Sequence, residues 1–427
     1  MIRDALLVFG LLLSTATQLR ISGLPLGPGE TCLALWFGLG LALRIRDLSL
    51  IPNTALMRLI SFWLVIAAAE CVGMMMGFAV ELFFDTESII HDLTAYTLLV
   101  GVGCMAALDL ADDYRRRRVV WLFASFGAAL FIVLLANGMG LFSFSMVEPW
   151  YFNRLKGWSK DPNQLGFVAS ALTILAIFLA ETARKALEVI CSLCCAILAF
   201  SIGLLTRSDT YVACILSASV VFIIVKSWRA LQNRESCLTV GAAFIWLMIA
   251  SLPLTVLAAA PFVPAAIKAV DEYSEAVYDE DGQGETRLEL WSEAISKGVE
   301  SSLLGFGPGA HLTNKSYKEP PPHKFEAHNA PLQLLTQGGV LASLAFLWLC
   351  LSAVYNSWRA HLPAITAMAC TLFVFSLTHY VVRHPVFWFC IVICLLEVER
   401  AKRTDHKERR SRVVMLRSPI NSTGVLS

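Results

Sequence analysis

One histidine stands where the sequence predicts the start of a helix. In the segment from Glu326 to Pro331, Asn329 is a favoured N-cap residue, and proline is tolerated in a first helical turn. His328 should therefore lie at the mouth of this helix, where unpaired backbone N–H groups favour a bound anion. A neutral imidazole there is a candidate general base. The alternative interpretation is that His328 only caps the helix or packs at the membrane interface.

Basic residues form a second candidate group, because several fall in segments that the predicted topology places on the outer side of a membrane. Basic residues are normally enriched in cytoplasmic loops, so an anionic ligand is one reason to keep them on the other side. Snorkelling towards lipid headgroups is the other interpretation. Arg207 lies in a very short turn and could also simply pair with Asp209. The outer basic residues are Arg154, Lys156, Lys160, Arg207, Arg287 and Arg383.

Three further patterns carry less weight. Glu70 falls in the middle of an apolar run, where a carboxylate is a functional candidate unless it pairs with a polar group of a neighbouring span. His311 and His323 lie near His328, but no cysteine or clear third ligand accompanies them, so a zinc site is not expected. The glycines of Gly305–Gly309 lack the preceding strand and the following Gly-Lys-Ser/Thr of a phosphate loop. A hinge or tight packing against the membrane is the favoured interpretation for them.

The elements that must position these residues are membrane-spanning helices. Hydrophobic residues make up 57% of the 427 positions and charged residues only 16%, against about 25% charged in an ordinary soluble domain. Apolar runs recur that approach the roughly 20 residues needed to cross a bilayer as a helix. The net charge is +1, so the overall charge indicates no nucleic-acid partner. The basic tail after residue 398 is interpreted as a cytoplasmic anchor beside anionic lipid headgroups.

Windowed hydropathy predicts about twelve spans, and the basic residues orient them. With the N-terminus inside, the short inner loops carry Arg44, Arg46, Arg58, Arg115 to Arg118, Arg184, Lys185, Lys226, Arg229, Arg234 and Arg359. The outer loop at 81–92 is acidic, and both termini are then cytoplasmic. The predicted spans are 5–19, 29–45, 57–80, 90–110, 119–141, 165–181, 186–205, 209–225, 237–260, 329–355, 363–382 and 384–398.

One large hydrophilic segment interrupts the spans and divides the chain. The predicted parts are residues 1–260 with nine spans, 261–328 as an outer loop, 329–398 with three spans, and 399–427 as the basic tail. Within the loop, Leu288, Trp291, Ile295 and Val299 recur at helical spacing after a capping-box pattern of Thr286 and Glu289. We therefore expect an amphipathic helix that lies on the membrane or roofs the spans.

Six short segments, in this order and spacing, resemble the signature of the superfamily of O-antigen ligases and O-antigen or exopolysaccharide polymerases. They extend over residues 150–345, and the topology agrees over the whole chain. One departure is Asp209, which follows Arg207-Ser208 where relatives tend to have a small residue. The segments are Gly157–Gly166, Leu205–Ser208, Thr286–Trp291, Leu304–Gly309, His328-Asn329 and Gln337–Val340.

The resemblance implies an all-α polytopic membrane protein of about twelve transmembrane helices with a GT-C-like architecture, in a bacterial inner membrane. It implies a metal-independent, inverting glycosyltransferase with no cofactor, acting at the periplasmic face on an undecaprenyl-diphosphate-linked saccharide donor. Carried over by motif, Arg207 and Arg287 would bind the diphosphate, and His328 would deprotonate the acceptor hydroxyl. Arg154, Lys160, Asn329 and Arg383 would add to substrate binding. The remaining partners would be a glycan acceptor, membrane lipid and other polysaccharide assembly proteins.

Two alternatives remain open from the sequence. The acceptor can be another lipid-linked chain, as in a polymerase, or the lipid A core, as in a ligase, and we favour the polymerase. A transporter or flippase of polysaccharide or lipid-linked sugar is the alternative from another class. That class expects two similar halves with polar or helix-breaking residues in corresponding spans, whereas this sequence concentrates its polar residues in one loop.

Overall fold

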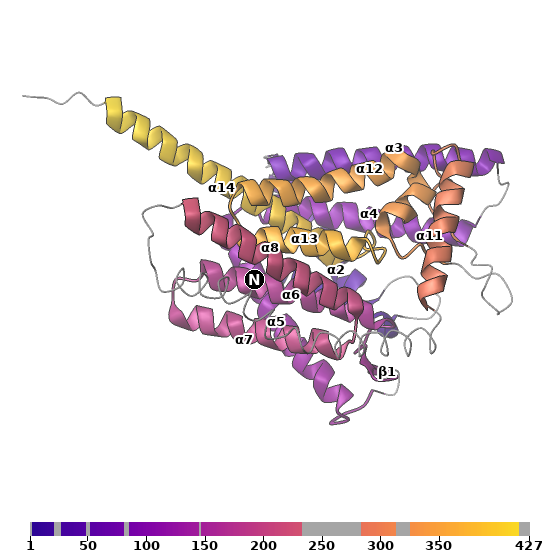
Figure 1. Ribbon diagram of the computed structural model, residues 1–427, viewed down its shortest axis with the longest axis horizontal. Helices are drawn as coiled ribbons and strands as arrows, with labels where there is room; N and C mark the ends of the chain where they lie inside the picture. Colours follow the sequence, from indigo (N-terminus) through magenta and orange to yellow (C-terminus); the bar gives the residue numbers. More distant parts are fainter. Residues whose placement is uncertain are drawn as a thin grey trace, which may run out of the picture.

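The protein is an all-α polytopic membrane protein, as the sequence predicts (Figure 1). The structure is a computed structural model, and it describes residues 2–20, 27–47, 52–80, 85–144, 147–232, 283–312 and 325–417. Its helices are α1 (Ile2–Leu13), α2 (Pro28–Asp47), α3 (Thr54–Val80), α4 (Thr86–Asp109), α5 (Asp113–Gly138), α6 (Pro162–Thr182), α7 (Ala186–Leu205), α8 (Asp209–Gln232), α11 (Gln283–Glu300), α12 (Ala330–Arg359), α13 (Pro363–Ser376) and α14 (Pro385–Arg417). A 3-10 helix, η1 (Thr17–Leu19), and a hairpin of β1 (Trp150–Tyr151) and β2 (Arg154–Leu155) complete the described elements.

Seven of these helices, α3 to α8 and α12, are long and apolar enough to cross a membrane. The predicted span at 237–260 lies outside the described residues. Each of the other predicted spans overlaps a helix, but the one predicted at 5–19 ends as an α-helix at Leu13. The total of about twelve spans stays a prediction. One boundary is wrong in a way that affects the site: the span predicted at 363–382 ends as a helix at Ser376. Residues 377–384 form a turn between α13 and α14 instead.

Local sequence signals explain where several helices begin. Asp85, Asp112 and Asp161 stand before α4, α5 and α6, and each side chain accepts a hydrogen bond from a backbone N–H of the first turn. Asn329 does the same for α12, with Pro331 in the first turn, as predicted. Such caps satisfy N–H groups that the helix itself leaves unpaired.

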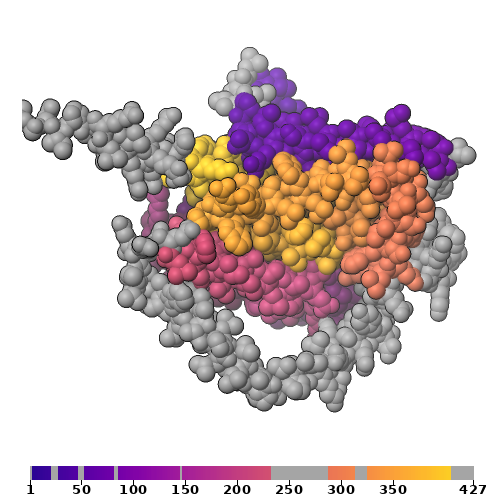
Figure 2. All heavy atoms as spheres, turned by 45° about the horizontal axis from the view of Figure 1, so that its top comes forward, coloured from indigo at the N-terminus to yellow at the C-terminus, as the bar shows by residue number. Residues whose placement is uncertain are grey.

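The helices form one bundle in which distant segments of the chain pack together. Helix α3 packs against α12, and α13 lies between α8, α6 and α14. Figure 2 shows α3 and α12 side by side, with α8 along the lower edge. The first half of α14 is the apolar centre, where Phe387 and Trp388 are fully buried. Helix α6 is buried over most of its length, so the segments at its N-terminus, near Asp161, are held against a rigid element.

Helix α12 is broken at Gly338 and Gly339, and the glycine-rich segment docks into the break. Phe306 N donates to Thr336 O at 2.9 Å, Gly307 N donates to Gln337 O at 2.8 Å, and Val340 N donates to Leu303 O at 2.9 Å. These bonds use the carbonyl and N–H groups that the break leaves without intrahelical partners. Gly305–Gly309 is thus packed tightly against α12 and α3, not against the membrane alone as the sequence suggested.

Helix α11 lies across one end of the bundle, beside the start of α12 (Figure 1). It begins at Gln283, before Thr286, so the predicted capping box is not its N-terminus. Its apolar residues divide between two faces. Leu290 and Ala294 are buried on the protein, whereas Leu288, Ile295 and Val299 are exposed. The residues that pack with Leu290 and Ala294 are Leu312, Phe325, Ala327 and Leu332, which bring the segment before α12 under the helix.

Candidate active site

The β1–β2 hairpin carries Arg154 to the N-terminus of α6. Tyr151 and Arg154 are paired across its turn. The Arg154 Nε atom donates to Thr206 O at 3.2 Å, and its Nη2 atom donates to Asn163 Oδ1 at 3.2 Å. Arg154 therefore bridges the start of α6 and the α7–α8 turn, and its partners are neutral oxygens.

Arg207 occupies that α7–α8 turn, directly after the carbonyl that Arg154 contacts. Its backbone has φ +47°, the left-handed region that non-glycine residues seldom adopt, and its side chain is exposed. Within the described part of the chain no ion pair joins Arg207 to Asp209. The simple pairing considered from the sequence is therefore not formed. A strained backbone at an exposed cation is a pattern found at functional sites.

Arg287 projects from the first half of α11 and affects two histidines. Its positive charge lowers the pKa of both His328 and His379. The helix is held in place by Trp291, whose Nε1 atom donates to Ala327 O at 2.9 Å, directly before His328. Packing of α11 on the segment before α12 is thus what brings Arg287 to the histidines.

His328 lies immediately before the N-cap of α12 and has φ +46°. Burial is the largest cause that lowers the pKa of His328, followed by the charge of Arg287, whereas Asp161 opposes them. A lowered pKa keeps the imidazole neutral at physiological pH, the state that a general base needs.

His379 is a second histidine of this cluster, and the sequence analysis missed it because the predicted span at 363–382 placed it inside the membrane. The rings of His328 and His379 meet edge to face with centroids 6.3 Å apart. The His379 side chain is 8% exposed, and its Nε2 atom has no hydrogen-bond partner among the described residues. Burial, Arg287, His328 and Arg154 lower the pKa of His379 to about 3. The Thr378-His379 pair after a helix of small and apolar residues was the only sequence signal.

Asn329 holds His328 in place. Its Oδ1 atom accepts from Leu332 N at 3.1 Å, and its Nδ2 atom donates to Leu377 O at 2.9 Å. The same amide thus caps α12 and ties the turn that carries His379 to the segment that carries His328. With both polar atoms used in this way, Asn329 is placed to act through the position of the two rings.

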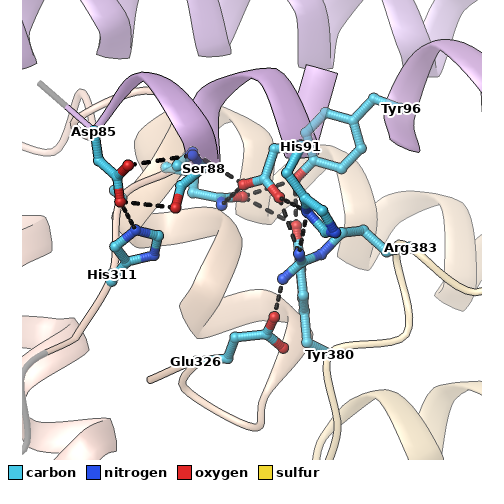
Figure 3. A network of polar contacts seen from close by, with 12 residues as sticks. Asp85, Ser88, His91, Tyr96, His311, Glu326, Tyr380 and Arg383 are labelled. Atoms are coloured by element: carbon cyan, nitrogen blue, oxygen red, sulfur yellow. Dashed lines mark hydrogen bonds and ion pairs between the residues drawn. The ribbon is translucent and has the colours of Figure 1, made fainter. Parts of the chain in front are cut away.

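Arg383 and Lys160 lie in different surroundings from the histidines. Arg383 pairs with Asp92 at 3.0 Å and with Glu326, and its guanidinium lies over the Tyr380 ring at 4.9 Å (Figure 3). The Lys160 side chain is exposed, and its backbone N–H donates to Thr17 Oγ1 at 2.8 Å. The structure therefore brings together Arg154, Arg287, His328 and His379, with Arg207 beside Arg154.

The remaining candidate residues from the sequence do not belong to this cluster. His311 Nε2 lies 3.0 Å from Asp85 Oδ2, and His323 lies outside the described residues. No group of three His, Cys, Asp or Glu side chains in the described ranges could hold a metal ion. Glu70 is buried in α3 against the break of α12, and neither carboxylate oxygen has a described partner.

The charges of the cluster are unbalanced. In the part of the chain that the structure describes, no carboxylate forms an ion pair with Arg154, Arg207 or Arg287, and Asp161 is the only acid whose charge acts on His328. The guanidinium groups of Arg154 and Arg287 beside neutral imidazoles are an arrangement that could bind an anion next to a base, and Arg207 lies in the turn that Arg154 contacts. The fold and this site define a multi-pass membrane protein with a cationic, histidine-containing centre at one end of its bundle.

Residues 194–347 match the model of the O-antigen ligase family. The match includes Arg207, Arg287 and His328, so it confirms the resemblance drawn from the sequence motifs, and it indicates an O-antigen ligase-like glycosyltransferase. Arg154, Lys160, His379 and Arg383 lie outside the matched residues. No curated protein matches the chain.

Proposed function

We propose that the protein is a metal-independent, inverting glycosyltransferase that transfers saccharide from an undecaprenyl-diphosphate-linked donor at the periplasmic face of a bacterial inner membrane. The carrying observation is the packing of α11 on the segment before α12, where Trp291 Nε1 donates to Ala327 O at 2.9 Å beside the paired rings of His328 and His379, and the charge of Arg287 lowers the pKa of both histidines. A cation and a neutral imidazole side by side are the two groups that this reaction needs. The donor lipid would reach them from the membrane around the bundle.

The chemistry divides between the arginines and His328. The acceptor hydroxyl gives its proton to the His328 imidazole while its oxygen forms a bond to the anomeric carbon. The bond from that carbon to the diphosphate oxygen breaks, and the leaving group takes the electron pair. Arg287 and Arg207 neutralise the diphosphate, and Arg154 adds a third guanidinium. Attack opposite to the leaving group inverts the anomeric configuration.

The charge distribution supports the proposed orientation. The predicted inner basic residues fall at helix ends away from α11, as Arg44 near the end of α2 and Arg58 at the start of α3 illustrate. Arg115 and Arg118 lie at the start of α5, where both pair with Asp4 of α1. By the positive-inside rule this end faces the cytoplasm and the cluster faces the periplasm. Both termini are then cytoplasmic.

We favour a polymerase of exopolysaccharide, capsule or O-antigen repeat units. The ligase is the second candidate, because the matched family is described as O-antigen ligase. Both reactions use the same lipid-linked donor, the same arginines on its diphosphate and the same base, His328. They differ only in the acceptor. The acceptor is the lipid A core for a ligase and a second lipid-linked glycan for a polymerase.

A deletion strain that carries the gene intact or as His328→Ala tests the function and separates the two reactions. Loss of long chains, with single repeats still attached to the core, indicates the polymerase. Loss of every core-attached repeat, with accumulation of lipid-linked polymer, indicates the ligase. His361→Ala is the matched control, because His361 lies in the α12–α13 turn at the other end of α12. Wild-type glycan from His328→Ala would remove the catalytic assignment and favour the transporter.

The purified full-length protein tests the arginines. Arg287→Gln should lower turnover of the lipid-linked donor by roughly 100-fold, because it removes charge that stabilises the leaving diphosphate. Arg287→Lys should recover part of it, since a lysine keeps the charge without the bidentate fork. EDTA should leave the wild-type rate unchanged. A rate that EDTA abolishes and Mg²⁺ restores would contradict the metal-independent mechanism.

A further inference from the structure

A cavity of about 300 Å³ opens beside the cluster, between the ends of α1, α2, α4, α6 and α14. Gln164, Glu326 and Tyr380 contribute to its wall. Gln164 follows Asp161 by three positions, Glu326 precedes His328 by two, and Tyr380 directly follows His379. The cavity therefore shares three short segments with the proposed catalytic centre, and a molecule held in it would approach that centre.

The charges that line this cavity are balanced, unlike those of the arginine cluster. Arg20 pairs with Glu30, and Arg383 pairs with Glu326 and Asp92 (Figure 3). A diphosphate would have to compete with these carboxylates for each guanidinium. A neutral molecule with many hydroxyl groups would instead find donors and acceptors that already stand in fixed positions.

The other lining groups also suit a saccharide. Ser14, Thr17 and Thr94 add hydroxyl groups, and Leu98 and Leu99 add an apolar surface for the C–H face of a sugar ring. His384 lines the same cavity with its ring.

We propose that this cavity is the binding site of the acceptor saccharide, separate from the arginine cluster that binds the donor diphosphate. The inference rests on the proposed function and assigns the second substrate a place. The ion pairs of Arg383 hold Glu326 and the turn that carries Tyr380 in place, so that both residues can form hydrogen bonds with the saccharide. The acceptor hydroxyl then reaches His328 from the side of Glu326.

Saturation-transfer NMR of the full-length protein in lipid nanodiscs tests binding directly. Two probes are used: the repeat-unit oligosaccharide released from the host's lipid-linked intermediates, and the delipidated core oligosaccharide. Binding of the first indicates a polymerase acceptor, and binding of the second a ligase acceptor. Neither probe carries a diphosphate, so the arginine cluster contributes little to the signal.

Thr94→Trp is the decisive variant, because an indole at this position fills the cavity. It should raise the Kd of the bound probe roughly tenfold or more. Thr97→Trp is the matched control, since Thr97 is exposed on the same helix and does not line the cavity.

Equal affinity in the wild type, Thr94→Trp and Thr97→Trp would overturn the assignment, as would failure of both probes to bind the wild type. If Thr94→Trp raised the KM for the lipid-linked donor and left the KM for the acceptor unchanged, the assignment would also be overturned. His328→Ala should bind the probe normally and transfer nothing. If the purified wild type transferred no glycan although it bound the probe, the proposed function would fail while the binding result stood by itself.

Discussion

The rings of His328 and His379 stand edge to face, with planes at 80° and centroids 6.3 Å apart. They come from two turns that are separated by α12 and α13, and Asn329 joins those turns through Leu377 O. The His379 ring also stacks on Phe375 at 4.6 Å. A neutral imidazole that packs on Phe375 thus forms one side of the surroundings of His328.

Asp161→Asn should move the acidic limb of the pH–rate profile to lower pH. The Asp161 charge raises the pKa of His328, so its removal lowers that pKa further. The neutral base then persists to lower pH. Asparagine caps helices as well as aspartate does, so the start of α6 should be preserved. The measurement is kcat/KM against pH for both proteins, and a limb that moves to higher pH would contradict the assigned base.

His379→Phe should make the protein less sensitive to acid. The folded-state pKa of His379 is about 3, against 6.5 for an unperturbed histidine. The unfolded chain therefore binds a proton that the folded chain does not, and stability is complete above pH 6.5 and lost as the pH falls towards 3. At pH 5 this site should cost about 2 kcal/mol of unfolding free energy.

Thermal unfolding of the detergent-solubilised protein at pH 7.5 and pH 5 measures this difference. Phenylalanine keeps the stacking on Phe375 and cannot titrate, so the gap between the two melting temperatures should narrow. His361→Phe is the control for a histidine outside the cluster. An unchanged gap in His379→Phe would show that His379 does not carry the acid sensitivity.

Asn329→Ala should reduce both stability and turnover. Loss of an N-cap side chain costs about 1 kcal/mol, and loss of the bond to Leu377 O frees the two histidine turns from each other. Asn329→Asp keeps the acceptor for Leu332 N, removes the donor and adds a negative charge facing Leu377 O, so it should retain more stability than turnover. Melting temperature and kcat separate the two effects. Wild-type kcat in Asn329→Ala would show that the tie is dispensable.

Gly339→Ala should destabilise the break in α12. Gly339 has φ +66°, and a Cβ atom there would lie 2.1 Å from Leu303 O. The backbone conformation alone costs a non-glycine residue about 1–3 kcal/mol, and the contact adds to it. Gly38→Ala in α2 is the matched control, because nothing lies within 4 Å of its Cβ position. That control should be neutral or stabilising by up to about 1 kcal/mol, and equal melting temperatures for the two variants would contradict the packing argument.

Much of the site could be predicted because its signals are local. Asn329 and Pro331 indicated a helix start that the structure confirms, and that start placed His328 at the end of the bundle. His379 could not be found in the same way. Its apolar surroundings extended a hydropathy window past Ser376, and only the three-dimensional arrangement shows that the helix ends there. The burial of Leu290 and Ala294 of α11 could not be predicted either, because their partners, Leu312 and Ala327, belong to irregular segments without periodicity.

The sequence by itself determined the membrane class, the places of most helices and the charge asymmetry between the two ends. Those properties follow from hydropathy and loop charge, which act over some twenty consecutive residues. Only the tertiary structure decided that Arg287 and His379 lie beside His328 while Arg383 pairs with Asp92 and Glu326. Such pairings depend on how helices far apart in the chain pack, and no local pattern encodes the distance between side chains on different helices.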